Sequence, residues 1–320
     1  MHPFVYAVHQ SVLRDDLIDF DAPILVGFST GPDSEFLYHY LNHVYRPDLL
    51  HLVYVNHHLR PATDLAHELS RVTALGQRHP VHSVDAPITG ASGIEARARE
   101  ARYTEFERIA REHGISQIST GHHYDDHIET ILLQLIRGTQ RGLRGIAQTK
   151  PWGPGILIRP LIHCYKADIL AYLDAHQLPY TCDSTNADTQ FTRNKIRHTL
   201  LPLLQSLNPK IHDRLNTFAT YHEGVHDFLD QHHADAYARI IKQHQHCQID
   251  RHYLIQQPNI TQRYLLLHMA QHVTQTPANH QHIQTILALA NTPPFPKYTQ
   301  LPGHVHVTIQ TETVSLKRTR

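Results

Sequence analysis

The sequence has few cysteines, no long apolar run and no excess of charge of either sign. Its three cysteines lie far apart, at Cys164, Cys182 and Cys247, so they favour neither a disulfide framework nor a four-cysteine zinc site and indicate a reducing, cytoplasmic environment. No apolar stretch approaches the roughly 18 residues of a membrane span, and residues 1–20 lack the apolar segment of a secretion signal. The 29 basic residues balance 29 acidic ones, which excludes a protein that binds nucleic acid as a polycation.

The composition indicates a folded chain that is long enough for two domains. Apolar residues make up 41% of the sequence and charged residues 18%, which is sufficient for a core and too apolar for a disordered chain. At 320 residues the chain exceeds one ordinary core, so we expect a first domain at 1–215 and a second at 216–320. The 31 histidines are interpreted mainly as compositional bias; a pH-sensing or metal-storing role is left open.

The first half of the chain alternates strand-like and helix-like segments. Uninterrupted short apolar runs predict buried strands, and apolar residues at helical spacing predict the helices between them. This alternation predicts an α/β fold with an open, doubly wound, Rossmann-like parallel sheet. The expected strands are Ala22–Phe28, Leu49–Val55, Val81–Val84, Gln117–Thr120 and Ile156–Ile158, and the expected helices are Ser34–Val44, Asp64–Gln77, Gly93–His113 and Asp125–Arg137.

The strand-helix rhythm stops after about residue 205. Pro209–Gln245 is expected to be mostly helical, and Tyr253–Val273 contains another helix pattern. His304–Leu316 alternates apolar and polar residues, which is typical of a half-exposed antiparallel hairpin. We therefore expect a smaller C-terminal domain of helices followed by a terminal β-hairpin.

The loop after the first strand has the features of an anion site. In an open parallel sheet, ligands bind beyond the carboxyl ends of the strands, and a helix that begins there presents free N–H groups to phosphate. Ser29, Thr30 and Ser34 add hydroxyl groups, and Gly31 permits close approach of the backbone. The loop has no lysine and does not have Walker A spacing. A polar turn that only caps the helix is the alternative.

An aspartate in this loop conflicts with a site for phosphate alone. Asp33 would repel a phosphate unless a cation lay between them, and a Mg²⁺ ion bound to Asp33 resolves the conflict.

A second polar cluster follows the fourth expected strand. A helix is expected to begin near Asp125, which places the carboxylates of Asp126 and Glu129 on one face of that helix. His122 lies just before it, where the strand leads into the helix. Helix capping is the alternative for the aspartates. A zinc site is a weaker alternative, since His123 and His127 have helical zinc spacing but no third ligand is evident.

Basic residues are concentrated locally despite the neutral total. Thr130–Ala167 contains six bases, Arg137 and Arg141 among them, and no acid. Arg193 and Arg197, at i and i+4, are the pair expected to contact RNA. Arg102, on the long helix, suits a nucleotide because of its planar guanidinium. Ordinary surface charge is the alternative for all of these.

The loop sequence Phe28–Ser34 resembles the S-G-G-x-D-S pyrophosphate loop of the N-type ATP pyrophosphatases. Thr30 replaces the first glycine of that pattern, and a threonine would be strained there if the position requires a positive φ. The ordered motifs that follow make residues 22 to about 205 similar to the tRNA(Ile)-lysidine synthase family. These motifs are Val55–Pro61, Glu95–Tyr103, Thr120–Thr130, Arg137–Leu143, Arg159–Leu161, Asp183–Asn186, Arg193–Arg197 and Leu201–Leu203.

The resemblance implies an enzyme with an adenine nucleotide alpha hydrolase-like fold that uses ATP and Mg²⁺ to join free L-lysine to the wobble cytidine of the CAU anticodon of tRNA(Ile). An adenylated cytidine is the intermediate; the products are lysidine, AMP and pyrophosphate, and the tRNA is recoded from AUG to AUA. The C-terminal domain would bind tRNA, no membrane is involved, and a homodimer is left open. For ATP, the resemblance implies Ser29, Thr30, Gly31, Pro32, Asp33 and Ser34, with Asp33 also binding Mg²⁺. For catalysis it implies Asp33, Asp126, Glu129, His122 and Arg102. For tRNA binding it implies Arg193, Arg197, Arg137 and Arg141.

Two other functions are weighed against this one. A tRNA thiolase of the same loop group is disfavoured because the sequence has no C-x-x-C pair. A tRNA-binding PP-loop protein that does not form lysidine is the alternative that Thr30 suggests.

Overall fold

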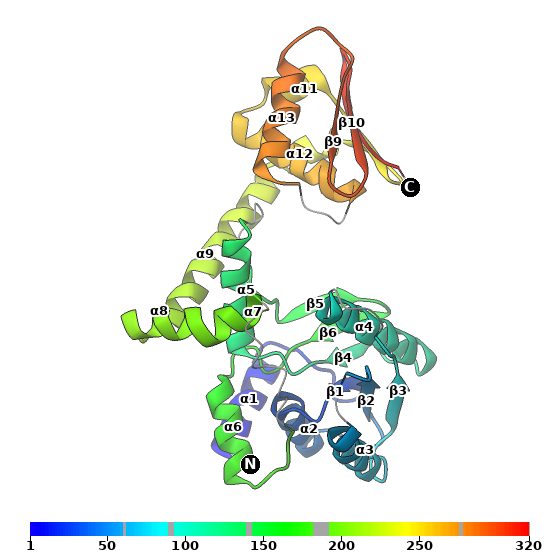
Figure 1. Ribbon diagram of the computed structural model, residues 1–320, viewed down its shortest axis with the longest axis vertical. Coiled ribbons are helices and arrows are strands. Elements are labelled where there is room, and N and C mark those ends of the chain that lie inside the picture. The colour runs from blue at the N-terminus through cyan, green and yellow to red at the C-terminus, as the bar shows by residue number, and fades with distance from the viewer. Residues whose placement is uncertain (60–61, 89–92, 139–142, 182–191, 275–277, 320) are drawn as a thin grey trace. The chain divides into compact units, whose positions relative to one another are not determined.

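The computed structural model describes residues 1–59, 62–88, 93–138, 143–181, 192–274 and 278–319 (Figure 1). The chain divides into two compact units. The first comprises Met1–Arg137 and Arg144–Ala219, and the second comprises Gly138–Leu143 and Thr220–Arg320.

A six-stranded mixed sheet organises the first unit. Its order is β3-β2-β1-β4-β6-β5, and all neighbouring pairs are parallel except β5 with β6. The parallel-dominated α/β fold expected from the sequence is therefore confirmed. The strands are β1 (Ile24–Phe28), β2 (Leu50–Asn56), β3 (Val81–Asp85), β4 (Gln117–Ser119), β5 (Thr149–Trp152) and β6 (Gly155–Ile158).

Helices cover both faces of this sheet. Figure 1 shows α4 on one face and α1, α2, α3 and α6 on the other. No helix of the described residues is long and apolar enough to cross a membrane. The helices are α1 (Pro3–Arg14), α2 (Pro32–Val44), α3 (Ala62–Leu75), α4 (Ile94–Glu112), α5 (Tyr124–Ile136), α6 (Lys166–Ala175), α7 (Thr192–Lys195), a π-helical turn (Ile196–Leu200), α8 (Leu201–Leu207) and α9 (Ile211–His232), of which α9 continues into the second unit.

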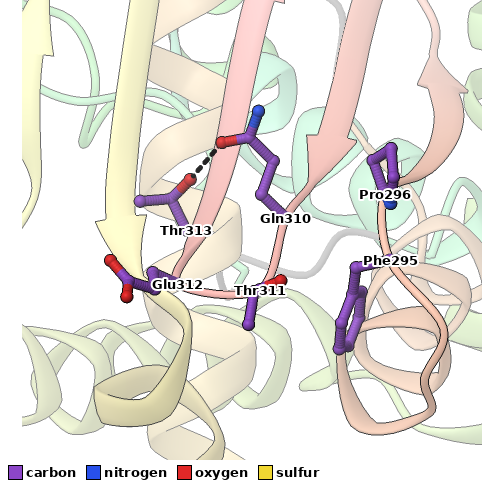
Figure 2. Close-up of a pocket in the computed structure, with 6 residues that line it drawn as sticks. All are labelled: Phe295, Pro296, Gln310, Thr311, Glu312 and Thr313. Carbon is purple, nitrogen blue, oxygen red and sulfur yellow. Dashed lines mark hydrogen bonds between the residues drawn. The ribbon is translucent and has the colours of Figure 1, made fainter.

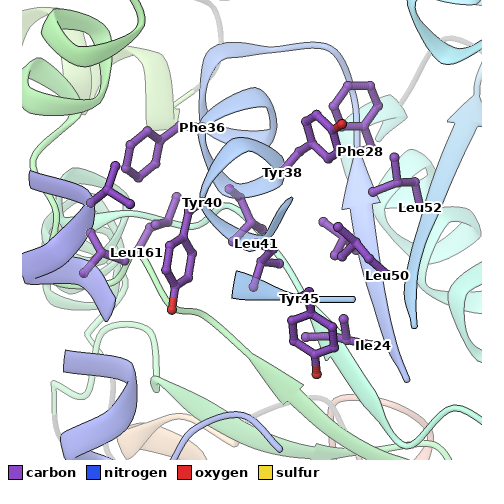
Figure 3. Packing of buried hydrophobic residues seen from close by; sticks show 14 of the residues in the cluster. Ile24, Phe28, Phe36, Tyr38, Tyr40, Leu41, Tyr45, Leu50, Leu52 and Leu161 are labelled. Atoms are coloured by element: carbon purple, nitrogen blue, oxygen red, sulfur yellow. The ribbon is translucent and has the colours of Figure 1, made fainter. Parts of the chain in front are cut away.

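Burial on both faces explains why β1 reads as an unbroken apolar run. Ile24 and Phe28 pack in one cluster with Phe36 of α2, and Figure 3 shows this packing. Leu25 points to the other face and packs with Phe106 of α4. Because successive side chains of a strand alternate between faces, both faces must be apolar when both are covered.

The strand order creates a switch point beside β1. The chain passes from β1 to β2 and β3 on one side and then returns to β4 on the other side of β1. In open α/β sheets, ligands bind at such a point, at the carboxyl ends of the strands. The segments that follow β1 and β4 are the two polar clusters singled out in the sequence.

The second unit contains a five-stranded antiparallel sheet rather than a hairpin alone. The expected hairpin is present as β10 (Val305–Ile309) and β11 (Thr313–Arg318), with Val307 opposite Leu316. The sheet order is β7-β8-β11-β10-β9. The remaining elements are α10 (Ala234–Ala238), β7 (Ile241–Gln243), β8 (His246–Asp250), α11 (Arg251–Gln256), α12 (Asn259–Val273), α13 (His280–Asn291) and β9 (Lys297–Leu301).

Candidate active site

The loop after β1 and the loop after β4 touch at the switch point. A Cβ atom added to Gly121 would lie 3.0 Å from the backbone carbon and oxygen of Asp33, so a larger residue would push the two loops apart. Gly31 is the N-cap of α2, and Pro32 occupies its first turn. The backbone N–H groups at this helix start have no partner within the helix, and they carry the partial positive charge of the helix dipole.

Ser34 shapes the turn from inside. Its hydroxyl group donates to the carbonyl of Gly31 at 2.9 Å and accepts from the N–H of Ser29 at 3.1 Å. Ser34 is buried whereas Ser29 is exposed, and the two hydroxyl oxygens lie 3.2 Å apart. The predicted loop residues therefore divide into a buried support, Ser34, and an exposed group, Ser29, that a ligand could reach.

Thr30 has the left-handed backbone conformation that the glycine of the pattern would accept more readily. Its φ is +58°, in a region where a β-branched residue is strained. Its side chain is buried, and its hydroxyl oxygen lies 2.7 Å from the hydroxyl oxygen of Thr181. The N–H of Thr181 also donates to the carbonyl of Thr30 at 2.9 Å. The Thr30 side chain thus faces Thr181, so only its backbone remains for the predicted contact with phosphate.

The carboxylate of Asp33 is paired with a lysine that the sequence analysis counted only as a base. The ammonium group of Lys166 lies 2.5 Å from Oδ1 of Asp33, and both side chains are about 30% exposed. Lys166 begins α6, where its N–H donates to Asp125 at 2.8 Å. Asp125 thereby fixes the start of α6 and the position of the lysine. A cation already neutralises Asp33, at the end of the loop where phosphate was predicted.

The residues present fit a Mg²⁺ ion that arrives together with a nucleotide. Mg²⁺ is usually held by one or two carboxylates, phosphate oxygens and water, and Asp33 can supply one such carboxylate. Within the described ranges, no group of three His, Cys, Asp or Glu side chains could hold a metal by itself. His127, which the weaker zinc alternative needed, instead contacts the carbonyl oxygen of Ile146 at 3.1 Å and Asn216 at 3.1 Å.

His123 lies between the aspartates of the two loops. Its Nε2 atom is 3.7 Å from Asp33 and 3.5 Å from Asp126, and its Nδ1 atom is 3.6 Å from Asp125. Burial alone would lower the pKa of His123, but the three carboxylates outweigh it and raise that pKa. His123 thus lies within 4 Å of carboxylates from both loops and links them.

Two arginines cover the acidic face of α5. Arg193 bonds Glu129 at 2.8 Å and Asp126 at 2.9 Å, and Arg197 bonds Glu129 at 2.6 Å and Asp126 at 3.3 Å. The Glu129 side chain is 1% exposed. Burial alone would raise the pKa of Asp126, but His123 and Arg193 lower it, so this carboxylate is ionised. The structure thus brings together four of the predicted residues, and it gives both arginines carboxylate partners where RNA phosphate was expected.

His122 is a neutral member of the same site. Burial lowers its pKa to about 3; Asp126 opposes this shift, and the neighbouring Arg159 adds to it. Its Nδ1 atom lies 2.9 Å from the hydroxyl oxygen of Thr120. An imidazole with this pKa is neutral near pH 7, so it suits hydrogen bonding better than taking up a proton.

The remaining predicted residues lie apart from this cluster. Arg102 is exposed on α4, where its charge acts on His57 after β2. Arg137 ends α5 and is exposed, about 16 Å along the helix from Asp126. Arg141 lies outside the described residues.

A separate pocket of about 450 Å³ lies in the second unit (Figure 2). It is lined by the β10–β11 turn and by the segment before β9, and the hydroxyl group of Thr313 donates to Gln310 at 3.1 Å. Glu312 is the sole ionisable side chain among its lining residues, which are Phe295, Pro296, Gln310, Thr311, Glu312 and Thr313. The acidic, basic and histidine side chains that could take part in catalysis are instead gathered at the switch point of the first unit.

Comparison with known proteins agrees with this placement. The chain is 31% identical over 270 residues to a tRNA(Ile)-lysidine synthase of Geobacillus kaustophilus, a match that covers 81% of this chain and 58% of that protein. It is 34% identical over 231 residues to the bifunctional protein TilS/HprT of Listeria monocytogenes, covering 70% of this chain and 36% of that protein. The chain thus spans between about a third and three fifths of the length of these relatives.

A solved structure shares the fold. The U34-tRNA thiolase NcsA from Methanococcus maripaludis, with its [4Fe-4S] cluster, superimposes with a TM-score of 0.54 at 17% identity, covering 71% of this chain and 78% of that one. The PP-loop domain family model matches residues 8–204, which include both loops of the switch point and the arginines that cover α5. This chain therefore belongs to the PP-loop domain family.

Proposed function

We propose that this protein binds ATP with Mg²⁺ at the Ser29–Ser34 turn and ligates L-lysine to the wobble cytidine of the CAU anticodon of tRNA(Ile). The observation that carries the proposal is the contact of Gly121 with Asp33, which joins an anion-binding turn to an acidic cluster at one sheet edge. The similarity to tRNA(Ile)-lysidine synthases supports the choice of substrates.

The first half of the reaction requires pyrophosphate to leave. The ring carbonyl oxygen of cytidine attacks the α-phosphorus of ATP, and the bond from that phosphorus to the pyrophosphate oxygen breaks. N–H groups at the start of α2 stabilise the charge that develops on pyrophosphate, and Lys166 lies within reach of the same anion. Bound Mg²⁺, held by Asp33, would neutralise further charge.

The second half requires a cationic amine to be held and deprotonated. The lysine amine attacks the ring carbon that bears the adenylated oxygen, and a C–N bond forms. The bond from that carbon to the oxygen breaks, and AMP leaves with the former carbonyl oxygen of the cytidine. Free lysine has an amine pKa of about 10.4, so it arrives as an ammonium ion. Asp126 and Glu129 already bind two guanidinium groups, so this pair of side chains is suited to hold a cation such as an ammonium ion.

The proposal has two further parts. The first unit is the catalytic domain and the second is the tRNA-binding domain. Arg193 and Arg197 position the acidic face of α5, and direct RNA contact by Arg137 and Arg141 stays a prediction. The alternative function, a tRNA-binding protein that does not form lysidine, is favoured by one observation, the threonine at a left-handed position of the loop.

An incorporation assay separates these functions. The protein is incubated with ATP, radiolabelled lysine and a CAU-anticodon tRNA(Ile) transcript, and label in the RNA is measured. We expect ATP-dependent incorporation, and a transcript with uridine at the wobble position is the matched control that should remain unlabelled. RNA binding without incorporation would support the alternative instead.

The Thr30–Thr181 contact gives a prediction about ATP binding. We expect Thr181→Val to raise the KM for ATP about tenfold, because the strained turn loses a hydrogen-bond partner. Thr30→Gly should relieve the strain, by about 1–2 kcal/mol, and leave the KM near that of the wild type. In the double variant, Thr181→Val should raise the KM for ATP less than it does in the wild-type background. The measurement is the KM for ATP of each single variant and of the double variant. Thr73→Val, at an exposed threonine that bonds only its own helix, is the control, and a KM equal to that of this control would contradict the prediction.

A further inference from the structure

Lys166 is fixed by its backbone to the loop that follows β4. The N–H of Tyr124 donates to the carbonyl of Cys164 at 2.9 Å, and the N–H of Lys166 donates to the carboxylate of Asp125 at 2.8 Å. These two hydrogen bonds join the segment that enters α6 to the start of α5. The backbone of Lys166 therefore keeps its place, and the ammonium group can change partner only through the flexible four-carbon side chain.

The place of Lys166 in its helix does not explain the choice of a lysine. Lys166 is the first residue of α6, and the start of a helix carries the partial positive charge of the helix dipole. A cation is unfavourable there, whereas an acidic residue such as Asp168, in the same turn, is favourable. The favourable partner of the ammonium group is Asp33, in the turn after β1. The lysine therefore serves the site and not the helix.

The ammonium group occupies the carboxylate that the metal requires. It lies 2.5 Å from Oδ1 of Asp33, and Nε2 of His123 lies 3.7 Å from the same oxygen. Mg²⁺ lies about 2.0–2.1 Å from the oxygens that bind it, so an ion on this carboxylate would be close to the ammonium group and repelled by it. The ammonium group and a divalent cation therefore compete for Asp33.

A nucleotide offers the ammonium group a second partner. Asp33 is the second residue of α2, the helix whose free N–H groups form the proposed phosphate site. The side chains of Lys166 and Asp33 are both about 30% exposed, so a phosphate group can reach the ammonium group. An ammonium group forms charge-assisted hydrogen bonds to phosphate as it does to carboxylate. Its transfer to phosphate would free Asp33 for the metal.

We propose that Lys166 holds the place of the divalent cation at Asp33 while the nucleotide site is empty, and that it releases Asp33 by turning to the nucleotide phosphates. This role rests on the proposed binding of ATP with Mg²⁺. Metal and nucleotide then bind cooperatively, because each favours the state in which the ammonium group has left Asp33. Asp33 is neutralised by a cation in both states.

Titration with Mn²⁺ in the absence of nucleotide tests the competition at Asp33. Mn²⁺ prefers the same oxygen ligands as Mg²⁺, and its electron paramagnetic resonance signal measures the unbound ion. Lys166→Met removes the charge and keeps most of the length of the side chain, so it should bind Mn²⁺ at least about tenfold more tightly than the wild type. Lys166→Arg keeps the charge and should bind Mn²⁺ as weakly as the wild type. Lys150→Met, at an exposed lysine of β5, is the matched control.

Calorimetry with ATP in a buffer that contains EDTA tests the contact with phosphate. In an Asp33→Ala background the ammonium group has lost its carboxylate, so the effect of Lys166→Met reports contact with phosphate alone. We expect the double variant to bind metal-free ATP at least about tenfold more weakly than Asp33→Ala. The Lys166–Asp33 pair is partly exposed, so its loss should leave the melting temperature near that of the wild type, and Lys166→Gln is a second variant without the charge.

Three results would overturn the proposal. The first is a Lys166→Met protein that binds Mn²⁺ no more tightly than Lys150→Met. The second is a gain in Mn²⁺ affinity that persists when Asp33 is also replaced by alanine, since the ion would then lie elsewhere. The third is equal affinity of Asp33→Ala and the double variant for ATP. These measurements use neither tRNA nor lysine, so their outcome is independent of whether the protein forms lysidine.

Discussion

Asp33→Ala should reduce ATP-dependent AMP formation by at least about 100-fold. The carboxylate stands where the turn of backbone N–H groups meets the acidic loop after β4, because Gly121 lies close to the backbone of Asp33. Its removal deletes the predicted Mg²⁺ ligand and leaves Lys166 without the carboxylate that holds its ammonium group. The measurement is the rate of AMP and pyrophosphate release with CAU-anticodon tRNA and lysine.

The affinity of Asp33→Ala for tRNA should equal that of the wild type, because the substitution removes a group that acts on the phosphates of ATP and none that contacts RNA. Asp48→Ala is the matched control: Asp48 also pairs with a cation, Arg46, but it does so at the surface. Activity of Asp33→Ala close to that of this control would remove Asp33 from the metal role and refute the proposed ATP site.

The first strand, the loop after it and the following helix could be predicted from local sequence. Burial on both faces leaves an unbroken apolar run at β1, and the helix period begins directly after the polar turn. Alternation of strands and helices then restricts the topology, because crossovers in parallel sheets are right-handed. That is why a ligand site at the carboxyl ends of the strands could be predicted from the sequence.

Contacts between distant segments could not be predicted in this way. Lys166 meets Asp33 across 133 residues, and Thr181 meets Thr30 across 151. Arg193 and Arg197 lie in a locally basic stretch, so a count of neighbouring charges indicates an RNA surface. Their carboxylate partners come 64 to 71 residues earlier, and only the packed structure brings the two segments together.

The extra strands of the second unit were missed for a local reason. β8 buries Cys247 and Ile249 but fills its other positions with histidine, glutamine and aspartate, none of which favours a strand. β7 is three residues long and exposed. The terminal pair β10 and β11 was predicted because Val and Ile alternate there with polar residues, which is the pattern of a half-exposed strand.

Glu129→Gln should lower the free energy of unfolding by about 3–5 kcal/mol. The amide keeps the shape of the side chain but removes its charge, and two guanidinium groups then share Asp126 alone. Burial makes this costly, since the Glu129 side chain is 1% exposed. Glu105→Gln, at a half-exposed surface pair with Arg108, should cost less than about 1 kcal/mol in the same chemical denaturation experiment.

Stability alone would not show that Glu129 contacts lysine, so the buried pair of Glu35 and Arg71 provides the second control. Glu35→Gln also leaves a guanidinium group, that of Arg71, without its carboxylate. Because Glu35 lies on α2 and the lysine site lies on α5, this variant should destabilise the chain without altering the KM for lysine. Glu129→Gln, assayed at a temperature where it is folded, should raise the KM for lysine at least about tenfold, because one charge-assisted contact to the ammonium is lost. Pyrophosphate release without lysine should persist in both variants. If the two variants have the same KM for lysine, Glu129 supports the fold through its arginines, and Asp126 is left as the carboxylate that can hold the ammonium ion.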